Sequence, residues 1–175
     1  MRCTYQFHNI GYFQIGQKLY NEPPTSKLRF RQADMLDPKF AERNTNLQDR
    51  FHFVHTTNVI HLFDIKGQET FFRNLIYLAK PRGVIWGRQV GLAEDENVSA
   101  YRQPDGKGLR FTVNEFREFC FGISGWSPEE ARFDAQLVKY DEIRAKRVDK
   151  QWVLQWSITV PRDKSSGYRI LDSLG

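Results

Sequence analysis

A strand, a helix and a second strand follow one another in the middle of the chain, and this pattern constrains its fold most. Residues 51–57 and 83–88 are short and apolar, as buried strands are. Between them, apolar residues recur at helical spacing after Asp64, a good helix N-cap, and Pro81 and Gly83 are expected to stop the helix. Such a segment forms a βαβ unit with parallel strands and a right-handed crossover. The sequence therefore predicts an α/β fold.

Further elements extend this unit on both sides. Residues 27–33 alternate as a strand does and precede it. After it, Thr112 and Glu115 have the spacing of a capping box, which predicts a second helix. Segments 131–140 and 151–160 then alternate at period two. They predict an antiparallel strand pair that completes the sheet on its C-terminal side.

Length and composition fit a single domain. A chain of 175 residues can build one core, which we expect over residues 1–162, with a loose tail over 163–175. No apolar stretch reaches the roughly 20 residues of a membrane-spanning helix, and the first residues lack a secretory signal pattern. Two cysteines cannot form a disulfide framework. We therefore expect a cytoplasmic chain with no membrane span.

The charge pattern gives little support to nucleic-acid binding. The net charge is +5, and the basic residues are interleaved with acidic ones instead of forming one block. Glycine spacings typical of dinucleotide-binding and P-loop phosphate sites are absent, as is the Gly-x-Ser-x-Gly turn of many hydrolases. We therefore expect no nucleic-acid partner and neither of these enzyme classes.

Ligands of parallel α/β sheets bind beyond the carboxyl ends of the strands, where polar residues occur here. Asp34 could accept a hydrogen bond from a ligand amino group, although by spacing alone it is more often a turn residue. His61 could act as a general base near neutral pH or be a structural histidine. His52 and His55 point to opposite faces of their strand, so we expect no zinc site.

Five segments in order, from about Gly11 to Val160, carry a family resemblance. They read GYFQIGQKLYNEPPTSKLRFRQADMLDP, NVIHLFDIKGQ, PRGVIWGRQVG, FTVNEFREF and WVLQWSITV. Together they resemble the downstream part of fungal class I S-adenosylmethionine-dependent methyltransferases of secondary-metabolite clusters, which make meroterpenoids and polyketides. The resemblance implies an enzyme with a Rossmann-like sheet and S-adenosyl-L-methionine as its cofactor.

The resemblance also implies roles for individual residues. Asp34, followed by Met35, matches the acid that accepts from the adenine amino group, and the segment after the next strand lines the methionine side of the cofactor. The implied cofactor-binding residues are Asp34, Met35, Asn58, Val59 and Ile60. His61 is the implied base where the acceptor must lose a proton. The implied reaction is O-methylation of a hydroxyl or carboxylate on a small secondary-metabolite intermediate.

The sequence departs from the family at its N-terminal end. The glycine-rich loop after the family's first strand is absent, Phe7 aligns with the acid that holds the ribose, and MRCTYQF looks unrelated. The family's strand order is 3-2-1-4-5-7-6. We therefore expect an N-terminally truncated sheet lacking strands one and two, no neighbour for the strand at 27–33, and impaired cofactor binding and catalysis. The alternative is a non-catalytic α/β module or pseudoenzyme that binds a partner chain, and homodimerisation is left open.

Overall fold

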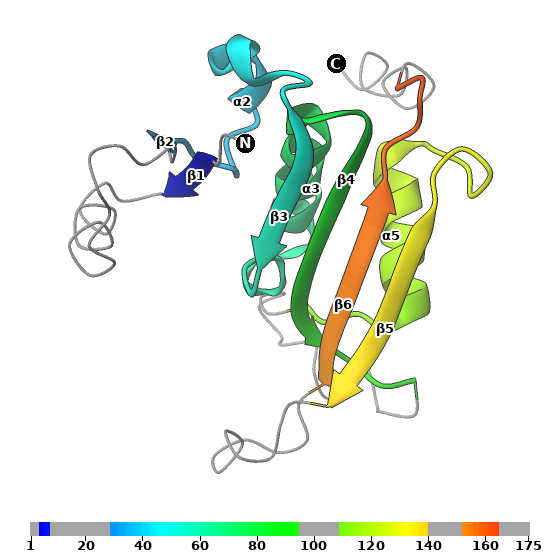
Figure 1. The fold of residues 1–175 in the computed structure, drawn as a ribbon. Coiled ribbons are helices and arrows are strands. Elements are labelled where there is room, and N and C mark those ends of the chain that lie inside the picture. The colour runs from blue at the N-terminus through cyan, green and yellow to red at the C-terminus, as the bar shows by residue number, and fades with distance from the viewer. Residues whose placement is uncertain (1–3, 8–28, 95–108, 140–151, 165–175) are drawn as a thin grey trace.

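The computed structural model describes residues 4–7, 29–94, 109–139 and 152–164. Its main sheet has four strands in the order β3-β4-β6-β5 (Figure 1). β3 (Phe51–Thr57) is parallel to β4 (Ala79–Gly91), β6 (Trp152–Thr159) is antiparallel to β4, and β5 (Phe133–Lys139) is antiparallel to β6. The predicted parallel unit and the C-terminal antiparallel pair are both confirmed.

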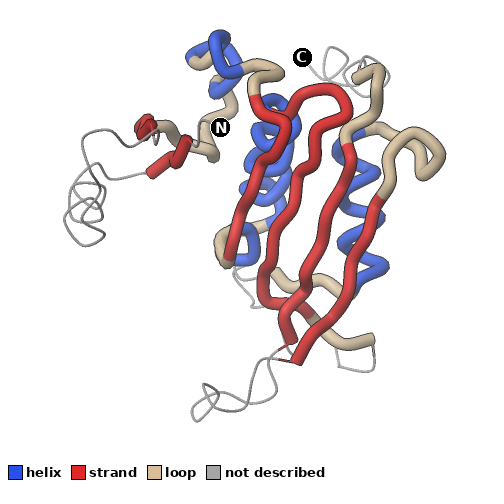
Figure 2. Tube along the Cα trace, in the orientation of Figure 1, coloured by secondary structure: helices blue, strands red, loops and turns tan. Residues whose placement is uncertain are grey.

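Two capped helices pack on one face of this sheet (Figure 2). α3 (Ile65–Leu78) begins at Asp64, whose Oδ1 accepts a hydrogen bond from the backbone N–H of Gly67 at 2.8 Å. α5 (Val113–Ser124) begins with the predicted capping box and ends at Gly125, whose φ of 67° suits glycine. Shorter helical turns are α2 (Phe40–Arg43), η1 (Thr45–Leu47) and η2 (Ile60–Leu62).

The core lies between the sheet and these two helices. Ile85 of β4 and Leu154 and Ile158 of β6 are fully buried on the helix side of the sheet. The ring of Phe116 on α5 lies 5.0 Å from that of Trp156 on β6, and Phe72 on α3 lies 5.9 Å from the same indole. Trp86 and Arg88 of β4 are exposed on the opposite face, which none of the described helices covers.

β4 starts earlier than the sequence predicts. α3 ends at Leu78 and the strand begins at Ala79, so Pro81 lies within β4 instead of terminating the helix. The register with β3 shifts between the pairs Phe51–Ala79 and Phe53–Val84. This bulge accommodates Pro81, which has no N–H to donate to a ladder.

The strand at 27–33 was expected to lack a neighbour, and this expectation is wrong. β2 (Arg29–Gln32) pairs in parallel with β1 (Thr4–Phe7), with Thr4 opposite Arg29 and Phe7 opposite Gln32. Part of the segment that looked unrelated is therefore a strand beside β2. These two strands form a sheet of their own and do not pair with β3.

The ordered body also continues beyond residue 162. Lys164 is buried, and its Nζ donates to the carbonyl oxygens of Ile76 at 2.8 Å and Ala79 at 2.7 Å and to the carboxylate of Asp49. Lys164, which was predicted to lie in the loose tail of 163–175, is therefore packed against the rest of the chain, and residues 165–175 lie outside the described part of the chain.

Candidate functional site

The segment after β3 turns sharply at the carboxyl edge of the sheet. Asn58 has a φ of 54°, and asparagine is among the residues that tolerate this left-handed conformation. Its backbone N–H donates to the carbonyl oxygen of Arg88 at 2.8 Å, which ties the turn to β4. The chain then enters η2, which carries His61. The predicted polar segment therefore follows the carboxyl end of β3 and lies beside β4.

His61 has the electrostatic environment of a neutral imidazole. Burial lowers its pKa from the ordinary 6.5, and the positive charge of Arg110 lowers it further. Its Nδ1 is buried and has no hydrogen-bond partner among the residues that the structure describes. A neutral imidazole with a free ring nitrogen can accept a proton, so the chemistry of a general base is available here.

Asp34 and Met35 lie in the turn after β2. The exposed Asp34 carboxylate accepts a hydrogen bond from the backbone N–H of Leu36 through Oδ1 at 2.9 Å. The Met35 carbonyl accepts from Asn74 Nδ2 on α3 at 3.0 Å. Asp34 therefore serves as a turn residue, which is the more frequent role of an aspartate at this spacing. Its other carboxylate oxygen is hydrogen-bonded to none of the described groups. Its role towards a ligand stays a prediction.

Val59 and Ile60 face the interior. Ile60 is 1% exposed and belongs to the core, while Val59 is half-buried and packs against it. A ligand at this edge would meet the backbone of Ile60 and not its side chain. The structure thus brings Asn58 to His61 together beside the end of β4, with Asp34 and Met35 on a separate turn that Asn74 ties to α3.

Two buried glutamines near this edge were missed by the sequence analysis. Gln68 on α3 donates through Nε2 to the carbonyls of Phe63 at 3.0 Å and Leu109 at 3.1 Å, but none of the described groups pairs with its Oε1. Gln89 on β4 is 1% exposed, and neither of its amide atoms has a partner in the described part of the chain. Buried polar groups are rarely left unpaired. The signal was the strand phase, since Gln89 follows the inward-facing Ile85 and Gly87 at intervals of two residues and therefore faces the same side of the sheet.

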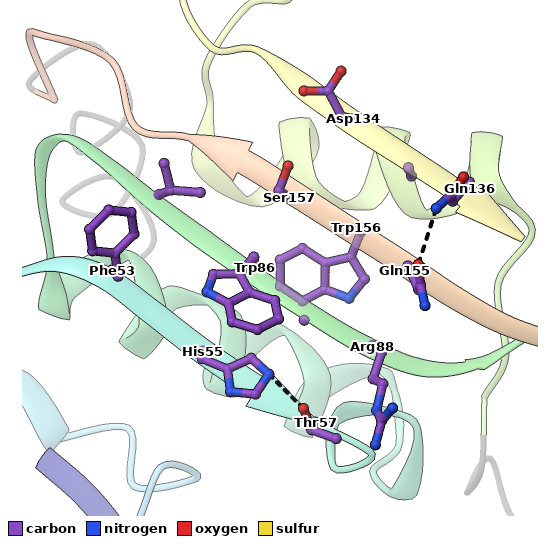
Figure 3. A pocket seen from close by; sticks show the side chains of 13 residues that line it. Phe53, His55, Thr57, Trp86, Arg88, Asp134, Gln136, Gln155, Trp156 and Ser157 are labelled. Atoms are coloured by element: carbon purple, nitrogen blue, oxygen red, sulfur yellow. Dashed lines mark hydrogen bonds between the residues drawn. The ribbon is translucent and has the colours of Figure 1, made fainter. Parts of the chain in front are cut away.

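The uncovered face of the sheet has a hollow of about 950 Å³ (Figure 3). The His55 ring stacks on Trp86 with centroids 3.8 Å apart, and His55 Nε2 is 2.7 Å from the Thr57 hydroxyl. Burial, and then the charge of Arg88, lower the pKa of His55. On the β5 side, Gln136 donates to Gln155 at 3.1 Å. Aromatic groups therefore line one half of this face and polar groups the other.

The described ranges contain no group of three His, Cys, Asp or Glu side chains that could hold a metal ion. None of the helices within them is long and apolar enough to cross a membrane.

No protein-family model matches the chain. A curated relative, the O-methyltransferase phiE of Fungal sp. (strain ATCC 74256), is 27% identical over 106 residues, which are 59% of this chain. The match spans about a third (34%) of that protein's length.

Solved structures are similar in fold at low sequence identity. A SAM-dependent methyltransferase from Methanosarcina mazei has a TM-score of 0.64 and 12% identity, with 91% of this chain and 82% of that one covered. The [4+2]-cyclase SpnF also has a TM-score of 0.64, with 9% identity, 93% of this chain and 67% of that one covered. One fold thus serves different reactions. The chain has an α/β methyltransferase fold with a mixed four-stranded sheet, as Rossmann-like class I methyltransferases do.

Proposed function

We propose that the chain is a methyltransferase that uses S-adenosyl-L-methionine and methylates an oxygen of a small secondary-metabolite intermediate in the cytoplasm. The observation that carries the proposal is the strand order β3-β4-β6-β5, which corresponds to 4-5-7-6 in the family's order. The distant likeness to a fungal O-methyltransferase supports the choice of oxygen as acceptor. The position of the polar segment from Asn58 to His61, after the carboxyl end of β3, supports this proposal, because ligands of parallel α/β sheets bind beyond the carboxyl ends of the strands.

The chain's residues fit the adenine side of this cofactor better than its ribose side. A methyl sulfonium supplies an already activated methyl group, so the protein mainly aligns the acceptor with it. Asp34 is exposed and can accept from the adenine amino group, and His61 can take the proton of a hydroxyl acceptor. On the ribose side, β1 ends in Phe7, which offers no carboxylate for the hydroxyls. We therefore propose weak cofactor binding by this chain.

A nitrogen-15 NMR titration with S-adenosylmethionine tests this function. We expect saturable shifts at the amides of Asp34, Met35 and Asn58 to His61 at millimolar cofactor. D34N should weaken the binding, whereas D134N, which changes an exposed aspartate on β5, should not. Shifts confined to other residues, or none, would contradict the proposal, and micromolar affinity would contradict its weak-binding part.

The second candidate is a non-catalytic module that binds a partner chain. The uncovered face of the sheet favours it, because Phe53 is 60% exposed and Trp86 is 45% exposed. Aromatic groups this exposed on adjacent strands are typical of an interaction surface. If the titration shows no cofactor binding while the chain self-associates or binds a protein partner, the partner-binding module replaces the methyltransferase as the proposed function.

A further inference from the structure

Asn74 in the middle of α3 holds a turn that lies far away in the sequence. The side chain is buried, and its Nδ2 donates to the carbonyl oxygens of Met35 at 3.0 Å and Asp37 at 3.4 Å. The two contacts join residues 39 and 37 positions apart. One amide group therefore fixes the backbone from Met35 to Asp37 against the helix.

Asp34 directly precedes this backbone and is hydrogen-bonded to it. The backbone N–H of Leu36 donates to Asp34 Oδ1 at 2.9 Å, and that of Asp37 donates to the Asp34 carbonyl oxygen at 3.3 Å. An aspartate that accepts from the backbone two residues ahead forms a turn in which its carboxylate is restricted in direction. Whatever fixes Leu36 and Asp37 therefore also fixes the direction of the Asp34 carboxylate.

Tyr77, about one turn further along α3, holds the next segment in the same way. Its hydroxyl donates to the carbonyl oxygens of Ala41 at 3.1 Å and Asn44 at 3.4 Å. The fully buried Phe40 packs edge-on against its ring, with the centroids 6.1 Å apart. These contacts fix α2 and the residue after it. The helix thus has two anchors of one kind, and Asn74 is the one that reaches the turn with Asp34.

The same helix is also tied to the other half of the candidate site. Gln68 donates to the carbonyl oxygen of Phe63, which directly follows η2 and its His61. Gln68 lies about 9 Å along the helix axis from Asn74. α3 therefore connects the turn with Asp34 to the segment with His61, and a site held by one rigid element is preorganised for its ligand.

We propose that Asn74 is a positioning residue for cofactor binding, which holds the turn Met35–Asp37 so that the Asp34 carboxylate is presented to the adenine amino group. This inference rests on the proposed function, and it gives Asn74 no contact with the cofactor. A carboxylate that is already fixed loses less conformational freedom when the ligand binds, so it binds more tightly.

The titration with S-adenosylmethionine tests the role of Asn74 through the amides of Asn58 to His61, which lie outside the altered turn. N74L keeps much of the side-chain volume and removes the donor. We expect N74L and D34N each to weaken binding about three- to tenfold. Because Asn74 acts through Asp34, the double variant D34N/N74L should bind no more weakly than D34N alone.

Y77F is the matched control, because it removes a donor of the same kind from the same helix. It should lower the stability to urea as N74L does, but it should leave the affinity within about twofold of wild type. Equal weakening by N74L and Y77F would show that general loosening of the segment, and not the Asp34 turn, decides binding. That result would overturn the inference. Circular dichroism confirms that every variant is folded.

The other outcomes separate the inference from the proposed function. If the wild type binds while N74L binds equally well, or if the losses in D34N and N74L add up in the double variant, the role of Asn74 is wrong and the function stands. If the wild type does not bind, both are wrong. Amide hydrogen exchange without ligand checks the turn itself: N74L should speed the exchange of the Leu36 amide, whereas Y77F should not. Unchanged exchange in N74L would also overturn the inference.

Discussion

Lys164 shows how one residue closes the core at the end of α3. Its ammonium group donates to two carbonyls at the helix C-terminus, those of Ile76 and Ala79, and to the Asp49 carboxylate. A positive charge is favourable there because the carbonyls at a helix C-terminus carry partial negative charge. Burial lowers the pKa of Lys164, and Asp49 opposes that shift. The contacts join residues 88 and 115 positions apart, which no local sequence pattern reports.

Replacing this lysine tests its contribution to stability. K164M keeps much of the side-chain volume but leaves buried carbonyl oxygens without their donor, which should lower the free energy of unfolding by about 1–3 kcal/mol. R162M changes an exposed side chain nearby and should stay within about 0.5 kcal/mol of wild type. Urea unfolding followed by circular dichroism measures both. Equal stability of K164M and wild type would show that Lys164 is not needed there.

At the scale of elements, two glycines show opposite constraints. A Cβ on Gly87 in β4 would lie 2.4 Å from the backbone carbonyl oxygen of Thr56 in β3, which no side-chain rotation can relieve. A Cβ on Gly122 in α5 would meet nothing within 4 Å. The same substitution should therefore have opposite effects in the strand and in the helix.

Urea unfolding of the two alanine variants checks this. G87A should lose about 1–3 kcal/mol or more, since overpacking forces β3 and β4 apart. G122A should gain about 0.5–1 kcal/mol, because alanine restricts the unfolded chain and favours the helix. A neutral G87A would mean that the strands shift easily, and a destabilised G122A would mean that α5 needs glycine for another reason.

The elements that the sequence predicted well are those with local signals. Asp64 and the Thr112–Glu115 box fixed where the two helices begin, because each cap is contained within four residues. The start of β4 was placed four residues late, because its first pair, Phe51 with Ala79, depends on a bulge. Alternation along one strand does not report a bulge, which is a property of the pairing.

At the scale of the whole molecule, the sheet class and its C-terminal order followed from the sequence, but the distribution of helices over its faces did not. The βαβ rule fixes the side of one helix, whereas α3 and α5 share a face only once β5 and β6 are placed. The place of candidate residues such as Asn58 could be predicted because they directly follow a strand, while their roles stay predictions. Gln68 and Gln89 were missed because a glutamine within a periodic run reads as surface-exposed.

Two histidines at different places in the molecule make its stability depend on pH. Burial lowers the pKa of both His55 and His61 below 6.5, with Arg88 and Arg110 adding to the effect. The folded chain therefore binds these protons less readily than the unfolded chain. At pH values above the histidine pKa of the unfolded chain, both imidazoles are neutral in the folded and the unfolded state. They then make no contribution to the pH dependence of stability. As the pH falls through 6.5, the unfolded state is protonated first, so the free energy of unfolding decreases.

Urea midpoints at about pH 7.5, 6.5 and 5.5 measure this dependence while most carboxylates remain ionised. Wild type should lose stability towards acid, and H55Q and H61Q should each remove part of the slope, whatever they do to stability at neutral pH. The double variant H55Q/H61Q should be nearly flat over the same range. If stability fell with pH as steeply in the double variant as in wild type, other groups would have to take up the protons. Neither imidazole would then be held neutral by the fold.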